Sequence, residues 1–362
     1  MLMVLLSVMF IAFVTGCNVS SDSNESNANN KKIEGVPEAM QGDVKVAVIR
    51  NLPSDDHTKQ FLDGARNEGE AFGFKVDTFI SDGDDARFQD LVRQAIQKDY
   101  DGLVISHGKA SYSYDMIKPA LDKGIKVVTF DTAATKDGKT LEGITSTAQN
   151  DHKLAEMSLD ELIEFAGQDG PPKIIKITIG GIVPLDKRDE IYTKYEEEGK
   201  IVTLEEVGPQ NMQNVQGDVT AAINSVLSKY GEGEVDAIWA AWDELAKGAY
   251  NAMKDNNRMD VKLISIDISN QDINLMREEG SSWMSTAAVD PHLIGVMDMR
   301  LLAKKIAGEE TPESYELEPS VIKQEELTTE TNMTNLGDVI KGWGISDDHN
   351  EDWMKILREK NN

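Results

Sequence analysis

Several residue types are scarce in this 362-residue sequence, and each shortage excludes a class of protein. Cys17 is the only cysteine, so the chain forms no internal disulfide, and a zinc site would need ligands from distant parts of the chain. The 37 Lys and Arg are outnumbered by 64 Asp and Glu, giving a formal net charge of -27. Nucleic-acid binding needs a positively charged footprint, so we expect no nucleic-acid partner. The acidic balance favours a well-hydrated surface, with an acidic face for a basic partner as the alternative.

Long apolar runs are also missing after the N-terminus. Residues 1–14 (MLMVLLSVMFIAFV) are apolar but fall short of the roughly 18 residues of a membrane-spanning helix, and they are typical of a signal peptide, although no Lys or Arg precedes them. Thr15 and Gly16 directly before Cys17 resemble a bacterial lipobox. This predicts a signal over residues 1–17 and a lipid on Cys17, anchoring the chain to the extracytoplasmic face of the cell membrane or in the periplasm. The alternatives are an ordinary signal peptide or a membrane anchor with an incidental cysteine.

Residues 18–42 contain little that a folded protein could bury. The stretch 18–30 is rich in Asn and Ser, and charged residues follow it. Ordering such a segment would lose chain entropy with little compensation, so we expect a flexible tether and a fold that begins near Asp43. About 320 residues remain, which is enough for two domains of ordinary size.

From Asp43 onward, short apolar runs of strand length alternate with stretches of helical spacing. Strands are predicted at 45–49, 74–80, 102–106, 126–130 and 143–146, and helices at 59–72, 88–98 and 114–123. After a turn-rich stretch at 167–172 the pattern restarts, with strands at 173–179, 200–207, 236–241 and 262–266, and helices at 186–198, 217–229 and 244–254. The alternation predicts an α/β protein of two similar lobes, each with a parallel sheet covered by helices.

Polar residues and one tryptophan follow the predicted strands, where ligands bind in such folds. These residues are Arg50, Asn51, Ser106, His107, Asp131, Thr132, Trp242, Asp243 and Asp267. A carboxylate accepts hydrogen bonds from neighbouring hydroxyls, an arginine donates to oxygens, and an indole stacks on the C–H face of a sugar ring. The set therefore predicts a polyhydroxylated ligand, although any one of these residues could simply begin a loop or cap a helix.

Six segments carry a family resemblance by their order and spacing. They are residues 61–65 (FLDGA), 100–106 (YDGLVIS), 120–131 (ALDKGIKVVTFD), 242–249 (WDELAKGA), 264–267 (ISID) and 290–295 (DPHLIG). Together they resemble type I periplasmic binding proteins of the ribose-binding class, the solute receptors of sugar ABC importers. The resemblance implies two doubly wound parallel-sheet lobes joined by a multi-segment hinge that closes on a ligand. The first lobe would comprise residues 43–147 and 290–322, and the second 148–289 with 323–362.

The resemblance also assigns roles to residues. Asp131 and Asp267 match the carboxylates that hold hydroxyls, and Arg188 matches an arginine that donates to the ligand. The chain departs from the ribose pattern at His57 and Thr58, where two aromatics are usual, and at Trp242, where an asparagine is usual. These departures predict a sugar or polyol other than plain ribose, stacked on Trp242. The full candidate ligand-binding set is Arg50, Asn51, His57, Ser106, Asp131, Gln149, Asn150, Arg188, Asn214, Trp242 and Asp267.

The predicted function is a monomeric, non-enzymatic receptor that delivers a sugar or polyol to ABC permease subunits. We expect no cofactor, metal or catalytic residue, because the five histidines lack metal-ligand spacing and the sequence has no P-loop or nucleophile elbow. A lipoprotein of the same fold that reports a sugar or signal to a membrane kinase or chemoreceptor is the alternative. A hydrolase using Asp131 and Asp267 is more distant. We expect the tail at 328–362, with a helix at 351–359, to pack along the hinge or the second lobe, with partner binding as the alternative.

Overall fold

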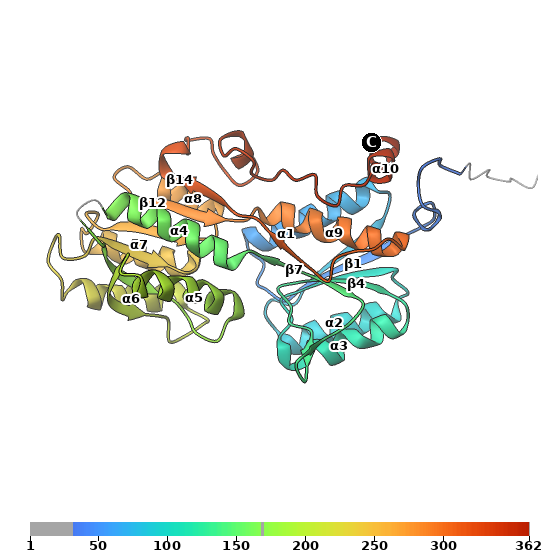
Figure 1. The fold of residues 1–362 in the computed structure, drawn as a ribbon, viewed down its shortest axis with the longest axis horizontal. Coiled ribbons are helices and arrows are strands. Elements are labelled where there is room, and N and C mark those ends of the chain that lie inside the picture. The colour runs from blue at the N-terminus through green and yellow to red at the C-terminus, as the bar shows by residue number, and fades with distance from the viewer. Residues whose placement is uncertain (1–31, 168–169, 362) are drawn as a thin grey trace, which may run out of the picture. The chain divides into compact units, whose positions relative to one another are not determined.

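Two six-stranded sheets organise the chain (Figure 1). The structure, a computed structural model, describes residues 32–167 and 170–361, so the predicted signal, the lipid site at Cys17 and most of the predicted tether lie outside the described residues. Within those ranges no helix combines the length and the apolar character needed to cross a membrane. The two-lobed α/β fold predicted from the sequence is confirmed.

The first sheet is parallel throughout, with the strand order β13-β7-β4-β3-β1-β2. Its strands are β1 (Lys45–Arg50), β2 (Lys75–Ile80), β3 (Gly102–Ser106), β4 (Lys126–Phe130), β7 (Ile144–Gln149) and β13 (Ser314–Leu317). Figure 1 shows α2 (Asp85–Gln97) and α3 (Ala110–Asp122) on one face and α1 (Asp56–Ala71) and α9 (Pro291–Ala307) on the other. A small ribbon, β5 (Thr135–Lys136) with β6 (Lys139–Thr140), follows β4.

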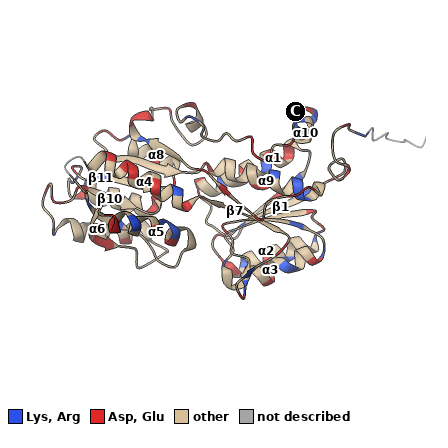
Figure 2. Ribbon diagram, in the orientation of Figure 1, with Lys and Arg blue, Asp and Glu red and all other residues tan. Residues whose placement is uncertain are grey.

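The second sheet has the order β14-β12-β11-β10-β8-β9, and only β14 runs antiparallel. Its strands are β8 (Lys173–Ile177), β9 (Val202–Val207), β10 (Ala237–Ala240), β11 (Lys262–Ile266), β12 (Trp283–Ala288) and β14 (Ser320–Lys323). The helices are α4 (Asp151–Ala166), α5 (Val183–Glu197), α6 (Val215–Leu227), α7 (Asp243–Asp255) and α8 (Asn270–Met276). Side chains alternate across this sheet: Ile238 packs in the cluster with α6 and α7, and Trp239 packs in the cluster with α4 and α5. Figure 2 shows acidic residues on helices of both lobes, with basic residues among them.

Three connections pass between the lobes. They are Asn150, between β7 and α4; Val289 and Asp290, between β12 and α9; and residues 318–319, between β13 and β14. Asn150 joins two of them, because its backbone N–H donates to Leu317 and its side chain donates to Glu318 Oε1 at 3.1 Å. The sequence-based boundary placed residues up to 322 in the first lobe, whereas β14 pairs within the second sheet.

The chain on either side of these lobes is more extensively packed than the sequence indicated. Val36 and Met40 are buried, so packed structure begins before Asp43. The C-terminal tail contains η2 (Gln324–Glu326), η3 (Leu336–Asp338) and α10 (Asp352–Asn361). Its first part packs in a cluster with Ile268, Ile273, Ala288 and Ile322 of the second lobe, through Met333, Leu336, Ile340 and Trp343. Its last part contacts the first lobe, where Arg358 donates to Glu68 of α1.

Candidate functional site

Three residues that directly follow strands have a left-handed backbone. His107 after β3, Asp131 after β4 and Asp267 after β11 have φ values of 65°, 43° and 71°. Residues other than glycine adopt this conformation uncommonly, and it costs free energy that the surrounding structure must offset. Asp131 and Asp267 follow the strands that occupy the same place in the order of the two sheets. The fold therefore presents one carboxylate from each lobe at matching strand ends.

The carboxylate of Asp131 has no hydrogen-bond partner among the described residues, although its side chain is only 8% exposed. The nearest ring nitrogen, Nε2 of His107, lies 3.8 Å from Asp131 Oδ2, which is too long for a hydrogen bond. Burial raises the pKa of Asp131 to about 8, with Asp151 and Asp267 raising it and Arg188 and Arg50 lowering it. Asp131 is thus an acceptor without a donor, within electrostatic reach of the charged groups of the second lobe.

Arg50 organises the first-lobe side of the site. Its side chain is fully buried, with its guanidinium carbon 4.6 Å from the centre of the Phe61 ring. Nε donates to Thr58 Oγ1 at 3.1 Å and one terminal nitrogen to Ser106 Oγ at 3.2 Å, while the other lies 2.7 Å from His57 Nδ1. Burial lowers the pKa of Arg50 to about 10, against the nearby carboxylates of Asp55, Asp131 and Asp298, which raise it. Arg50 therefore remains charged at neutral pH.

Arg188 organises the second-lobe side, and it is also buried. It donates to Asp151 Oδ1 at 3.0 Å, to Asp267 Oδ2 at 2.9 Å and to the carbonyl of Ala241 at 2.7 Å. Burial alone would lower the pKa of Arg188, but Asp267 and Asp151 raise it above its ordinary value. Arg188 and Asp267, predicted as partners of the ligand, thus also hold each other in place.

Two further groups at this site were missed from the sequence. Asp151, at the start of α4, is 2% exposed and anchors Arg188. Lys247, on α7, is 2.9 Å from Asp243 Oδ2, just after β10, and 3.5 Å from Asp272 Oδ1 of α8. An acidic residue in the first turn of a helix is a visible signal, but it does not reveal which arginine it meets.

Trp242 lies immediately before α7, where its side chain is partly buried and packs against the apolar clusters on both faces of the second sheet. Trp239 is instead fully buried, and its Nε1 donates to Ser158 Oγ at 2.9 Å. Asn214 is exposed just before α6. The two tryptophans therefore differ in environment as the sequence predicted, while the stacking role of Trp242 stays a prediction.

The three remaining amide candidates differ in whether their side chains already form hydrogen bonds within the protein. Asn51 donates to Asp85 and accepts from Ser81 Oγ, so its side chain already forms hydrogen bonds within the first lobe. Asn150 caps α4 by accepting from the backbone N–H of Lys153. Gln149 is buried, and its Oε1 has no hydrogen-bond partner in the described part of the chain. Of the three, Gln149 retains an acceptor for a ligand.

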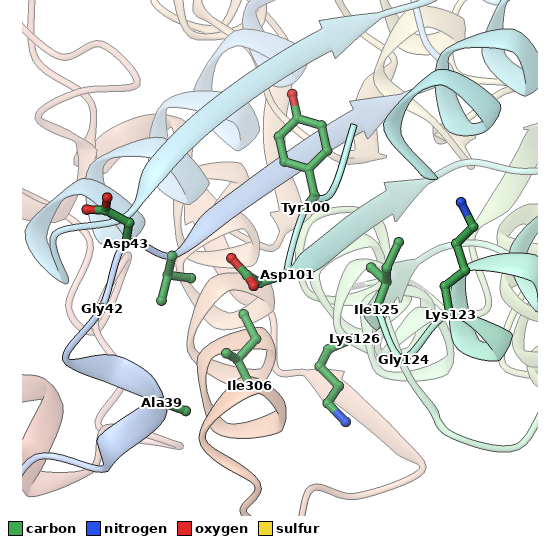
Figure 3. A pocket seen from close by; sticks show the side chains of 11 residues that line it. Ala39, Gly42, Asp43, Tyr100, Asp101, Lys123, Gly124, Ile125, Lys126 and Ile306 are labelled. Carbon is green, nitrogen blue, oxygen red and sulfur yellow. The ribbon is translucent and has the colours of Figure 1, made fainter. Parts of the chain in front are cut away.

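A surface hollow of about 460 Å³ lies at the opposite end of the first sheet (Figure 3). Its walls include Tyr100, Asp101 and Lys126, next to the amino ends of β3 and β4. Asp101 accepts from the backbone N–H of Lys45, and the Tyr100 hydroxyl donates to Asp77. These groups are satisfied by the protein itself, and in open α/β sheets ligands bind at the carboxyl ends of the strands. Across residues 32–167 and 170–361, no His, Cys, Asp and Glu side chains gather in a metal-binding group.

Comparisons with known proteins agree with this geometry. The family described as Periplasmic binding protein domain matches residues 46–310. The ribose import binding protein RbsB of Haemophilus influenzae is 24% identical over 263 residues, covering 72% of this chain and 85% of that protein. A crystal structure of a sugar ABC transporter protein from Yersinia enterocolitica is 45% identical, with a TM-score of 0.80, covering 91% of this chain and 100% of that one. The 5-methylthioribose transporter solute binding protein of Thermotoga lettingae, solved with 5-methylthioribose, is 27% identical with a TM-score of 0.77, covering 90% and 99%. The predicted resemblance is confirmed.

Proposed function

The chain belongs to the family of the periplasmic binding protein domain, and from that membership we propose that it captures a sugar or polyol between its two lobes and delivers it to the permease of an ABC importer. The family consists of solute-binding proteins rather than enzymes. One observation carries the choice of ligand: Asp131 is a nearly buried carboxyl group without a hydrogen-bond partner in the described chain, and Arg188 and Asp267 lie within electrostatic reach of it. A hydroxyl-rich neutral ligand supplies the missing donors.

The two buried arginines supply the hydrogen-bond donors that a hydroxyl-rich ligand needs in this proposal. Arg50 and Arg188 each carry five N–H groups, and the described residues accept from only some of them. The remaining donors suit ring and hydroxyl oxygens, while Asp131 accepts from hydroxyl hydrogens. Trp242 offers an indole face on the second-lobe side, and Gln149 offers a further acceptor. The lobes would close on the ligand by bending at their connecting segments.

The ligand is proposed to be a pentose or a pentose derivative. A relative 27% identical to this chain is a 5-methylthioribose transporter protein, and one 24% identical is a ribose import protein. His57 and Trp242 at positions that differ from the ribose pattern favour a modified pentose over ribose itself. No observation on this chain favours the sensing alternative.

Lipid anchoring at Cys17 belongs to the same proposal, because a receptor tethered by the Asn- and Ser-rich residues that follow Cys17 would stay close to its permease. We expect Cys17→Ser to abolish labelling by a radioactive or alkyne-bearing fatty acid and to release the protein from the membrane. Wild-type protein found without lipid in the cytoplasm would contradict this part of the proposal.

Calorimetry tests the ligand site directly. A thermal-shift screen of D-ribose, 5-methylthioribose, hexoses and alditols identifies the ligand, because a ligand that binds only the folded state raises the unfolding temperature. Asp131→Ala should then weaken binding by about 2–5 kcal/mol, or roughly thirty- to several-thousand-fold, since it leaves hydroxyls of the ligand without their hydrogen-bond partner in a desolvated site. Asp115→Asn is the control, because Asp115 is 67% exposed on α3 and pairs with Lys136. A loss of less than threefold for Asp131→Ala would place the site elsewhere.

A further inference from the structure

The hydrogen bonds of Arg50 determine where His57 carries its proton. The terminal nitrogen of Arg50 lies 2.7 Å from His57 Nδ1. A guanidinium only donates hydrogen bonds and does not accept them, so Nδ1 must be the acceptor and cannot carry a hydrogen. His57 is therefore a neutral imidazole with its hydrogen on Nε2. Burial, together with the charges of Arg50 and of Arg188 in the second lobe, lowers the pKa of His57 well below its ordinary value, in agreement with this assignment.

Ser106, which also contacts Arg50, determines in the same way which nitrogen of His107 carries the hydrogen. Ser106 Oγ accepts from Arg50 at 3.2 Å and lies 2.7 Å from His107 Nδ1. The serine is fully buried, and its hydroxyl hydrogen has no other acceptor within residues 32–167 and 170–361. It must therefore donate to His107 Nδ1, which leaves the hydrogen of this ring on Nε2 as well. Burial, Arg50 and His57 lower the pKa of His107 well below its ordinary value.

We propose that Arg50 is a positioning residue that fixes His57 and His107 as neutral rings with Nε2–H donors, beside the unpartnered carboxylate of Asp131. Neither Nε2 atom has a hydrogen-bond partner in the described chain, and that of His107 is 3.8 Å from Asp131 Oδ2. A hydroxyl can donate to the carboxylate while its oxygen accepts from an imidazole N–H. The arrangement selects a ligand whose hydroxyls both donate and accept, and this choice of ligand rests on the proposed function.

The surroundings of Arg50 keep it in the state that this role requires. Asp55 on the loop before α1, Asp131 after β4 and Asp298 on α9 are the carboxyl groups that favour the protonated guanidinium when they are ionised. The face of Phe61 and the hydroxyl of Thr58 fix its orientation. A lysine at this position would bring a positive charge but not the planar set of donors that reaches Thr58, Ser106 and His57 together.

Nitrogen-15 NMR of the ligand-free full-length protein, labelled at histidine, tests the assignment without any sugar. Long-range proton–nitrogen correlations distinguish the two neutral forms of the ring, and His57→Gln and His107→Gln identify the two signals. Both rings should show the Nε2–H form and remain neutral from neutral pH down to mildly acidic pH. A hydrogen on Nδ1 of either ring, or a charged ring at neutral pH, would overturn the proposal.

Two substitutions test the relay while leaving most of the fold intact. Ser106→Ala removes only the hydroxyl between Arg50 and His107, so the His107 signal should become a mixture of both forms while that of His57 stays unchanged. Arg50→Lys should release both rings. Ser113→Ala is the matched control, because Ser113 is a buried serine of the same lobe whose hydroxyl donates to the backbone of Lys109. Unchanged ring signals in both Ser106→Ala and Arg50→Lys would refute the relay.

Binding of 5-methylthioribose or D-ribose, whichever the screen selects, tests the donor role. His57→Gln keeps an N–H near the position of Nε2, whereas His57→Leu removes it. We expect Leu to weaken binding by about tenfold and Gln to restore most of that loss, as a single hydrogen bond implies. Equal losses for Gln and Leu would refute the donor role. Absence of sugar binding would count against the proposed function, while the ligand-free spectra still decide the state of the rings.

Discussion

Asp131 is nearly buried, has a left-handed backbone and lacks a hydrogen-bond donor among the residues described. This environment disfavours the ionised form of its carboxyl group. The pKa of this carboxyl group is about 8 in the folded protein, against an ordinary value of about 4. Between these two pH values the folded chain keeps a proton on Asp131 that the unfolded chain has lost. The contribution of protonated Asp131 to stability is complete below the pKa that this residue has in the unfolded chain. It is lost as pH rises toward the pKa that Asp131 has in the folded protein. Residues that serve a ligand commonly have this cost.

We therefore expect the stability of the ligand-free wild type to fall relative to that of Asp131→Asn as pH rises from about 4 to about 8. Thermal unfolding midpoints measured across this range test the prediction. Asp298, whose pKa burial raises to about 7, adds to the decline in both proteins, so the comparison must be between the two curves. Parallel curves for wild type and Asp131→Asn would contradict the raised pKa.

The two neighbouring tryptophans should respond differently to substitution. Trp239→Ala should lower the free energy of unfolding by about 3–5 kcal/mol, because the side chain is fully buried and its Nε1 is hydrogen-bonded. Trp242→Ala should weaken sugar binding more than tenfold, about 1.4 kcal/mol or more, and remove most of the ligand-induced fluorescence change. Urea unfolding and fluorescence titration separate the two effects. Normal binding with reduced stability for Trp242→Ala would make this residue purely structural.

At single residues, the sequence identified the strand-end groups better than their partners. Asp131 and Asp267 were predicted because they directly follow predicted strands, whereas Arg188, which lies within α5, was predicted only from the family resemblance. The contact between Arg188 and Asp151 could not be predicted, since it joins side chains 37 positions apart whose approach depends on how α4 and α5 pack. For the same reason Arg50 could be predicted as a ligand-binding candidate, but its contacts with Ser106 and His57 could not.

At the scale of elements, α1 and α9 approach closely enough to require glycine on both helices. A Cβ at Gly64 would lie 2.0 Å from the carbonyl oxygen of His292, and one at Gly295 would lie 2.1 Å from that of Phe61. Backbone atoms of a packed helix cannot move aside as the end of a flexible side chain can. These two positions therefore fix the distance between the helices that cover one face of the first sheet.

Gly295→Ala should destabilise the protein by about 1–3 kcal/mol or more through overpacking, even though alanine favours helix formation. Gly42→Ala is the control, because a Cβ at Gly42 would meet no atom within 4 Å. Chemical denaturation of both variants measures the difference. A Gly295→Ala variant as stable as wild type would show that the two helices can separate without loss.

The helices also show which elements the sequence reveals. The stretches corresponding to α1, α2 and α7 were predicted because apolar residues line one face and polar residues the other. α9 has no such contrast, since residues Ile294 to Ala303 are buried on every side, and α4 was overlooked although Leu154, Leu159 and Leu162 recur at helical spacing. Strand boundaries were close because both sheets are buried and rich in β-branched residues.

At the scale of the whole molecule, the C-terminal tail adds a fourth link between the lobes. Leu336 and Trp343 pack against the second lobe, and beyond them Arg300 of α9 donates to the carbonyls of Ser346 and Asp348 at 2.8 and 3.2 Å. Gly342 and Gly344, which flank Trp343, have φ values of 86° and 69°, a conformation that glycine adopts without strain. Any hinge movement of the lobes would therefore have to be accommodated by this segment of the tail as well as by the three other connections.

Arg358 attaches α10 to the first lobe. Arg358 donates to both carboxylate oxygens of Glu68, and its guanidinium carbon lies 5.0 Å from the centre of the Phe72 ring, which also contacts Trp353. Because Glu68 is nearly buried, Arg358→Ala leaves its carboxylate with Arg300 alone and should lower the free energy of unfolding by about 1–3 kcal/mol.

Lys355→Ala on the same helix is the matched control, since among the described residues Lys355 pairs only with the exposed Asp352, and such pairs contribute little. Urea unfolding of the two variants measures the anchor, and limited proteolysis shows whether the tail is released. We expect earlier cleavage within the tail for Arg358→Ala only, because the cluster around Trp343 still holds the preceding residues to the second lobe. Equal stability and equal cleavage for both variants would mean that α10 is not held by Glu68, and that other contacts, such as those of Arg300 with the carbonyls of Ser346 and Asp348, fix the tail to the first lobe.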